Sequence, residues 1–156
     1  MKIDVEQALL GFQATLLTNV LPVLGTDYVA GSAATIGFGL SFAAQEFDRA
    51  ADVLVADNRE IRALCAAGSE CIPDAKLTAR LREAATSQDA SFRISELSHN
   101  HDALNRLLIE LHTCLEELQN APAKTLEGKI LRHLKASAAR RELEFPVEET
   151  PVPVQE

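Results

Sequence analysis

The spacing of apolar residues along the chain predicts helices. Apolar positions recur every three or four residues over long stretches, which is the period of an amphipathic helix. We therefore predict five helices, at residues 5–20, 28–65, 74–85, 87–119 and 124–142. Asp4 is a candidate N-cap for the first helix, because Gln7 follows three residues later. The predicted fold is an all-α, mostly antiparallel bundle of four to five helices with two long central ones.

The stretch from Tyr28 to Cys65 is predicted as the central helix. Its first half, Tyr28 to Gln45, carries no charge and is rich in Gly, Ala and Ser. We expect this half to be buried nearly all round, by the fold or by a second subunit. A row of small residues at every fourth position would let another helix approach closely: Gly31, Thr35, Gly39 and Ala43.

The second half of this helix and the helix at 87–119 each carry one apolar seam with a polar residue in it. Asn58 interrupts the first seam and His101 the second. A buried polar residue needs a partner, so an Asn58–His101 hydrogen bond is possible if the seams pack together. His112 lies roughly 16 Å from His101 along the helix axis, so the two cannot bind one ion. Each histidine is interpreted as a satisfied boundary residue, or else as a ligand contact or pH-sensitive interface.

The remaining helix ends are predicted from individual capping residues. Thr26 is a candidate N-cap. Gly68 is a candidate C′ residue that precedes a loop at 69–73. Thr86 followed by Asp89 resembles a capping box for the helix at 87–119. Residues 1–144 are expected to form one domain, and the proline-rich, acidic stretch from Phe145 is predicted to be a disordered tail at 145–156.

Composition narrows the class of protein. The 156 residues are 47% hydrophobic and 4% aromatic, which suits close-packed helices. A net charge of −8 disfavours nucleic-acid binding, which depends on Lys and Arg. The N-terminal stretch places acids where a secretory signal needs positive charge, and no Lys or Arg closely flanks residues 28–45 as in a membrane span. Three cysteines without a CxxC pair fit reduced thiols, so we predict a cytoplasmic protein without a membrane segment.

One pair of residues has the spacing of a metal-binding motif. Glu96 and His99 form an ExxH pair, which places a carboxylate and an imidazole on one helical face. Di-iron bundles use two such pairs and two further glutamates, whereas this chain has one pair. The alternative is a solvated face with local ion pairs. We expect no cofactor, and we expect the basic last helix to pair with the protein's own acids.

Four short stretches in the first 64 residues carry a family resemblance: Leu21-Pro22, Ala30 to Ala34, Gln45-Glu46-Phe47, and Asn58-Arg59 to Leu64. With them, residues 5–64 resemble small bacterial all-helical domains of unknown function, encoded near or fused to aminoglycoside-phosphotransferase-like proteins. The resemblance implies a helical bundle with no established activity, and it transfers no catalytic residues.

Three functional hypotheses follow. The first is a non-enzymatic interaction or accessory module acting as a homodimer, with a further protein partner possible. The second is a binder of an apolar or acyl-like small molecule between helices, and the third is a metal-dependent enzyme that uses Glu96 and His99. A site is expected where the two halves of the central helix meet. The candidate ligand or interface residues are Phe38, Phe42, Glu46, Phe47, Asn58, His101 and His112.

Overall fold

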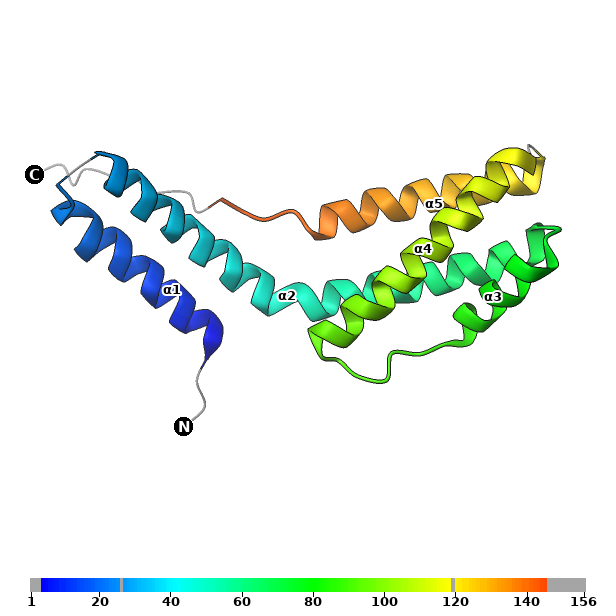
Figure 1. Cartoon of the computed structure of the whole chain (residues 1–156), viewed down its shortest axis with the longest axis horizontal. Coiled ribbons are helices and arrows are strands. Elements are labelled where there is room, and N and C mark those ends of the chain that lie inside the picture. The colour runs from blue at the N-terminus through cyan, green and yellow to red at the C-terminus, as the bar shows by residue number, and fades with distance from the viewer. Residues whose placement is uncertain (1–3, 26, 119, 146–156) are drawn as a thin grey trace, which may run out of the picture. The chain divides into compact units, whose positions relative to one another are not determined.

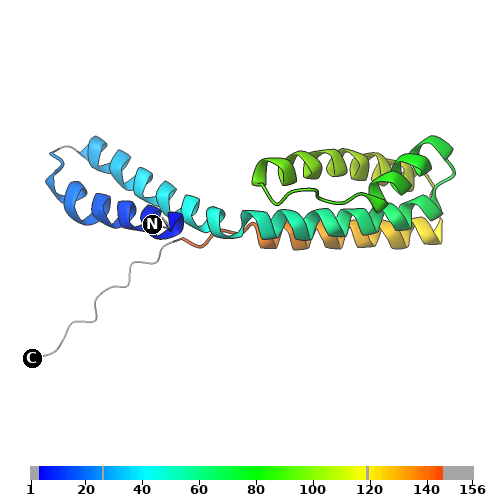
Figure 2. The same ribbon diagram turned by 90° about the horizontal axis from the view of Figure 1, so that it is seen from below.

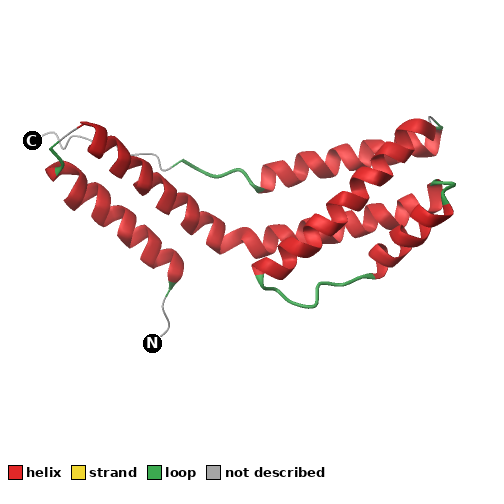
Figure 3. Cartoon of the chain, in the orientation of Figure 1, coloured by secondary structure: helices red, strands yellow, loops and turns green. Residues whose placement is uncertain are grey.

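The computed structural model describes residues 4–25, 27–118 and 120–145, and within these ranges it contains α-helices and no strand (Figure 3). The elements follow one another as α1 Val5–Thr15, α2 Asp27–Cys71, α3 Ala75–Thr86, α4 Ile94–Leu118 and α5 Ala121–Arg140 (Figure 1). A π turn at Leu16–Val20 and a 3-10 turn at Leu21–Val23 follow α1. The all-α prediction with two long helices is confirmed.

The chain divides into two compact units, and each is described by itself. Unit 1 comprises residues 1–49 and 143–156, and unit 2 comprises residues 50–142. The long helix α2 contributes residues to both units. The expectation of one domain over 1–144 stays a prediction. The tail predicted to be disordered, residues 145–156, lies outside the described residues except for Phe145, and the predicted Thr26 cap also lies outside them.

Unit 2 contains the main hydrophobic core. Figure 2 shows α5 running alongside the second half of α2, with α4 on another side. Leucine and isoleucine side chains from all four helices fill the space between them. The fully buried members include Ile61 of α2, Leu81 of α3, Leu111 and Leu115 of α4, and Ile130 of α5.

Gly68 shows how closely two of these helices pack. A Cβ added at Gly68 would lie 2.7 Å from both terminal methyl carbons of Leu111. The absence of a side chain at Gly68 therefore allows α2 to pack closely against Leu111 of α4. Helix α2 continues through Gly68 to Cys71. The prediction that Gly68 ends the helix is wrong, because a glycine inside a helix can be required by a neighbouring side chain as well as by a cap.

The predicted start of the fourth helix is also wrong. α4 begins at Ile94, while residues 87–93 form an extended strap after α3. Thr86 is the last residue of α3, and its hydroxyl donates to backbone carbonyls of that helix. Asp89 turns toward α2 and α4, so it caps no helix.

Side-chain caps fix three other helix starts. Asp4 accepts a hydrogen bond from the Gln7 amide at 3.2 Å, as predicted. Asp74 accepts from the amides of Lys76 and Leu77 at the start of α3. Asn120 accepts from the Ala123 amide at 2.9 Å, so α5 begins at Ala121, ahead of the predicted Lys124. Each cap satisfies an amide that the first helical turn leaves without a partner.

In unit 1, α1 and residues 27–49 of α2 form an antiparallel hairpin (Figure 1). Leu17 packs against Gly37, where an added Cβ would lie 2.9 Å from a Leu17 methyl carbon. Residues 143–145 return to this unit. The Gln45 side chain donates to the Glu144 carbonyl at 2.8 Å and accepts from the Glu144 amide at 2.9 Å. The Phe145 ring meets Phe42 edge-on, with centroids 5.2 Å apart.

Candidate interaction surface and buried polar network

The hairpin of unit 1 exposes an unusual number of large apolar side chains. None of the residues of α1 is buried. Phe12 is 64% exposed, Tyr28 86% and Ile36 59%. We call the following exposed residues the hairpin surface: Val5, Leu10, Phe12, Val20, Val23, Tyr28, Val29, Ile36, Phe38 and Phe47.

Charge is nearly absent around this surface. Between residues 5 and 45 the sequence contains two charged side chains, Glu6 and Asp27. Large exposed apolar patches on globular proteins mark sites of contact with another molecule. Among the described helices, none has a stretch long and apolar enough to cross a membrane. The hairpin surface is therefore the main candidate for an interaction site.

The row of small residues predicted from the sequence lies on the open side of α2. Gly31, Thr35, Gly39 and Ala43 are all exposed. A Cβ added at Gly31 or Gly39 would meet nothing within 4 Å. In residues 27–49 the buried positions are Ala33, Gly37, Ser41 and Ala44. The described part of the chain does not bury this segment all round, and burial by a second subunit stays a prediction.

The aromatic candidates from the sequence lie on the same segment of α2. Phe38 and Phe47 are 42% and 51% exposed, and Glu46 is exposed. Phe42 is half-buried and contacts Phe145. Their position fits an interaction surface, whereas Asn58 and His101 belong to a separate polar network in unit 2.

Asn58 and His101 are hydrogen-bonded, as the sequence suggested. Asn58 is fully buried, and its Oδ1 lies 3.0 Å from His101 Nδ1. Asn58 Nδ2 donates to Asp89 Oδ1 at 3.2 Å and to the Leu97 carbonyl at 3.3 Å. His101 Nε2 lies 3.3 Å from a nitrogen of Arg141. Burial, followed by the nearby Arg141 charge, lowers the pKa of His101 below its ordinary value.

Asp89 anchors the strap to α2 and α4. Its two oxygens accept from Arg62 Nη1 at 2.8 Å and Nη2 at 2.7 Å, and Oδ1 also accepts from Asn100 at 3.1 Å. Hydrogen bonds from Arg62 lower the pKa of Asp89, against the raising effect of burial. Arg62 completes the arrangement by donating through Nε to Ser87 Oγ at 3.0 Å.

A second set of charges joins the end of α5 to α2. Asp57 is fully buried and accepts hydrogen bonds from Arg140, Arg141 and Ser137, the last at 2.7 Å. Burial raises the pKa of Asp57, but the bonds from Ser137 and Arg141 outweigh it and the net pKa is lowered.

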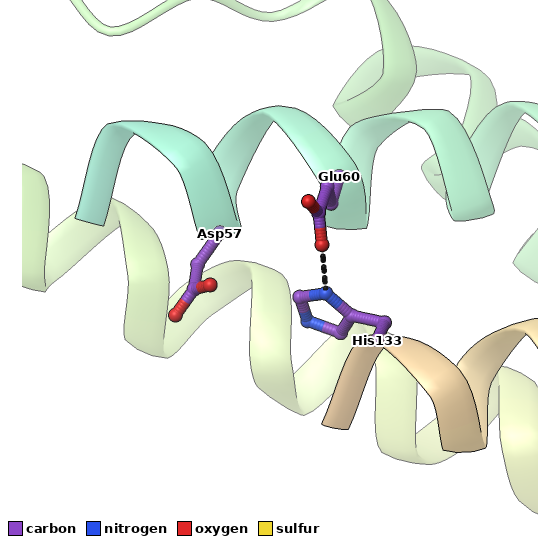
Figure 4. A group of neighbouring side chains, drawn as sticks. All are labelled: Asp57, Glu60 and His133. Carbon is purple, nitrogen blue, oxygen red and sulfur yellow. Dashed lines mark hydrogen bonds and ion pairs between the residues drawn. The ribbon is translucent and has the colours of Figure 1, made fainter. Parts of the chain in front are cut away.

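Glu60 belongs to the same set. It accepts from Arg140 and lies 2.8 Å from His133 Nδ1 (Figure 4). Burial raises the pKa of Glu60, but the hydrogen bonds from His133 and Arg140 lower it overall.

Three of these residues have the composition of a metal site. One oxygen each of Asp57 and Glu60 and a ring nitrogen of His133 lie within 4.8 Å of one another (Figure 4). Such ligands suit zinc, manganese or iron. Here both carboxylates already accept hydrogen bonds from arginines, and Arg140 and Arg141 offset their two negative charges. A divalent ion would meet uncompensated repulsion, so we interpret the group as an ion network that fastens α5 to α2.

The sequence did not identify this network. Asp57 and Glu60 are three residues apart, and Arg140 and Arg141 are adjacent. Spacing within one helix shows that two carboxylates share a face, but it does not reveal which helix supplies the opposing cations. The expectation that the last helix pairs with the protein's own acids holds for these two arginines.

The remaining candidates lie on the surface of α4. Glu96 and His99 are exposed, and neither forms a hydrogen bond or ion pair with the residues described. His112 is partly exposed, with its Nδ1 3.9 Å from a Glu116 oxygen one helical turn further on.

The resemblance of residues 5–64 to small bacterial helical domains stays a prediction. Comparisons of the chain with protein-family models, with curated proteins and with solved structures give no match.

Proposed function

We propose that this protein is a non-enzymatic interaction module that acts as a homodimer joined through the hairpin surface. The observation that carries the proposal is the exposure of nine large apolar side chains between residues 5 and 45, a segment with two charges, and of Phe47 just beyond it. Burial of such side chains stabilises an assembly by roughly 25 cal/mol for each Å² of apolar surface removed from water.

A second copy of the chain fits this surface. A two-helix hairpin has one internal interface, so the outer faces of both helices remain in water unless another element covers them. Two hairpins packed together would form a four-helix arrangement in which the apolar faces that meet are covered. In a two-fold dimer the same patch meets itself, and a patch with few charges does not repel its own copy.

The exposed row Gly31, Thr35, Gly39 and Ala43 supports the same arrangement. Small side chains allow two helix backbones to approach closely, which increases van der Waals contact between them. The row runs along the hairpin at helical spacing, so a partner helix could follow it over several turns.

The polar network of unit 2 supports a non-enzymatic role. The carboxylates of Asp57, Glu60 and Asp89 are hydrogen-bonded to arginines of the same chain. Carboxylates bonded in this way hold helices together. A general acid or base must be able to reach a substrate, which these carboxylates do not do while they are bonded to arginines.

Light scattering coupled to size exclusion tests the proposal. The chain has a mass of 16.9 kDa, and we expect twice this value at micromolar concentration. Phe12→Glu and Ile36→Glu, each made alone, should give monomers, because each places a charge within the proposed interface. Ile109→Glu is the matched control, since Ile109 is 65% exposed on α4 of unit 2 and should leave the dimer intact.

A monomeric wild-type chain at these concentrations would overturn the proposal, as would dimers that persist in both hairpin variants. Co-sedimentation with lipid vesicles tests the alternative that the hairpin surface binds a membrane. A monomer that pellets with vesicles, and loses this behaviour in Ile36→Glu, would assign the hairpin surface to a membrane in place of a second copy.

A further inference from the structure

A surface groove of about 410 Å³ lies between α2 and α5 in unit 2. Its floor consists of Ala63, Leu64 and Ala67 from α2 and Ala136 from α5. The groove exists because alanine is too small to fill the space between two helices at these positions. Its volume is within the range of about 300–1,000 Å³ that is usual for small-molecule sites.

Two cations border this apolar floor. Lys129 and Arg132 of α5 line the groove and are exposed, and neither forms an ion pair or hydrogen bond with any described residue. In contrast, Arg140 of the same helix is bonded to Asp57 and Glu60. Glu60 also borders the groove, but Arg140 and His133 already engage its carboxylate. The charge offered to a ligand is therefore positive, in a chain whose net charge is −8.

We propose that this groove binds a small carboxylate with a single apolar chain. The carboxylate would meet Lys129 and the guanidinium of Arg132, which can donate two parallel hydrogen bonds to it. The apolar chain would lie along the alanine floor and remove Ala63 and Ala67 from water. This activity is additional to dimerisation and does not depend on the hairpin surface.

A larger hollow in unit 2 is a poorer fit to the same ligand. It measures about 500 Å³ and lies between α2 and the strap, beside Arg62, Asp89 and Phe92. The Arg62 guanidinium there donates to Asp89 and Ser87. Arg59 is the one cation lining that hollow whose side chain has no partner among the described residues, and the Asp89 carboxylate borders the same space. The groove between α2 and α5 offers two such cations, Lys129 and Arg132.

Isothermal titration of the full-length chain with decanoate, below its micelle concentration, tests the proposal. We expect one molecule per chain, and little heat from decanol or decyltrimethylammonium. Lys129→Glu/Arg132→Glu should weaken binding at least about tenfold, because the contact with Lys129 and both hydrogen bonds from Arg132 are lost. Ala67→Leu should weaken it similarly by filling the floor.

Two control variants separate the groove from other surfaces. Lys124→Glu/Lys135→Glu makes the same charge change at exposed positions of α5 that do not line the groove, and it should bind decanoate like the wild type. Ile36→Glu alters the hairpin surface and should also bind normally. Absence of decanoate binding, equal binding of decanol, or an equal loss in the Lys124/Lys135 control would overturn the proposal.

Discussion

His101 Nδ1 lies 3.0 Å from Asn58 Oδ1, and this contact determines where the histidine carries its proton. Asn58 uses its amide nitrogen to donate to Asp89 and Leu97, so its oxygen can only accept. His101 Nδ1 must therefore be the donor. The other ring nitrogen, Nε2, faces Arg141, which has only donors. The bonding pattern thus selects neutral His101 with its proton on Nδ1.

Acid should destabilise the protein through His101 before it acts on the carboxylates. The folded-state pKa of His101 lies below the ordinary 6.5, so the unfolded chain binds more protons and stability falls as the pH drops below about 6.5. His101→Gln should remove this first loss, because glutamine can donate to Asn58 and accept from Arg141 without titrating. Urea unfolding of the wild type and of His101→Gln at pH 7.5, 6.0 and 5.0 measures this difference.

A second, steeper loss should follow at lower pH. The folded-state pKa values of Asp57, Glu60 and Asp89 lie below the ordinary 3.8, 4.5 and 3.8. Their ion pairs therefore contribute stability above those values, and this contribution is lost as the pH falls through the folded-state values. An unfolding free energy that stays constant between pH 5 and pH 3 would contradict the network as described.

The two sides of the Asp57 network should respond unequally to mutation. Arg140→Ala/Arg141→Ala leaves a fully buried carboxylate with Ser137 as its remaining partner, and should cost about 3–5 kcal/mol. Asp57→Ala should cost less, about 1–3 kcal/mol, because the arginine side chains are 28% and 39% exposed and can turn toward water. Urea denaturation of both variants measures the difference, and equal losses would show that Asp57 is better solvated than its burial indicates.

Two glycines offer a matched pair of alanine substitutions. Gly128→Ala should stabilise the protein by about 0.5–1 kcal/mol, because its Cβ meets nothing within 4 Å and alanine favours a helix. Gly68→Ala should destabilise by roughly 1 kcal/mol net, because its Cβ would collide with the buried Leu111. Thermal unfolding measures both changes, and a stabilising Gly68→Ala would show that Leu111 can move aside.

The exposed small row gives a test of dimerisation that introduces no charge. Gly39→Leu adds a side chain where nothing lies within 4 Å, so it should leave the fold of one chain intact. If a second copy packs on this row, the added bulk should weaken the dimer at least tenfold in sedimentation equilibrium. An unchanged dissociation constant would place the dimer contact elsewhere on the hairpin surface.

Cys65 reports on opening of the core in unit 2. The thiol is fully buried, and burial raises its pKa to about 11, so almost no thiolate forms at pH 8. Alkylation of Cys65 should wait for unfolding, whereas Cys71 is partly exposed and should react in the folded protein. Mass spectrometry of digested peptides distinguishes the two sites, and rapid labelling of Cys65 in the native state would contradict the packing around it.

Helix periodicity predicted most of the fold because it reflects local burial. The Asn58–His101 bond could also be anticipated, since each residue interrupts an apolar seam and a buried polar group requires a partner. The sequence could not distinguish the two roles of glycine, so Gly68 was interpreted as a helix end. The sequence also suggested that Asp89 belongs to a capping box. In the structure Asp89 instead bonds to Arg62 and Asn100, which are distant from it in sequence.

The candidate surface was harder to anticipate for a different reason. An uncharged helix can be covered by its own chain or by another molecule, and composition is the same in both cases. The burial of just Ala33, Gly37, Ser41 and Ala44 within residues 27–49 shows how narrow the face is that the described chain covers. The groove between α2 and α5 likewise depends on which alanines face each other across two helices, which spacing within either helix does not determine.

The bond between Arg62 and Asp89 has a consequence for how this sequence can change over time. The strap has no regular secondary structure of its own, and Asp89 ties it to α2 and α4. Apart from Ser87, which accepts from Arg62, the other residues of the strap can therefore be replaced, and the strap can change in length, at little cost. Positions 62 and 89 should instead change together in relatives of this chain, because loss of one charge leaves the other largely buried without its ion-pair partner.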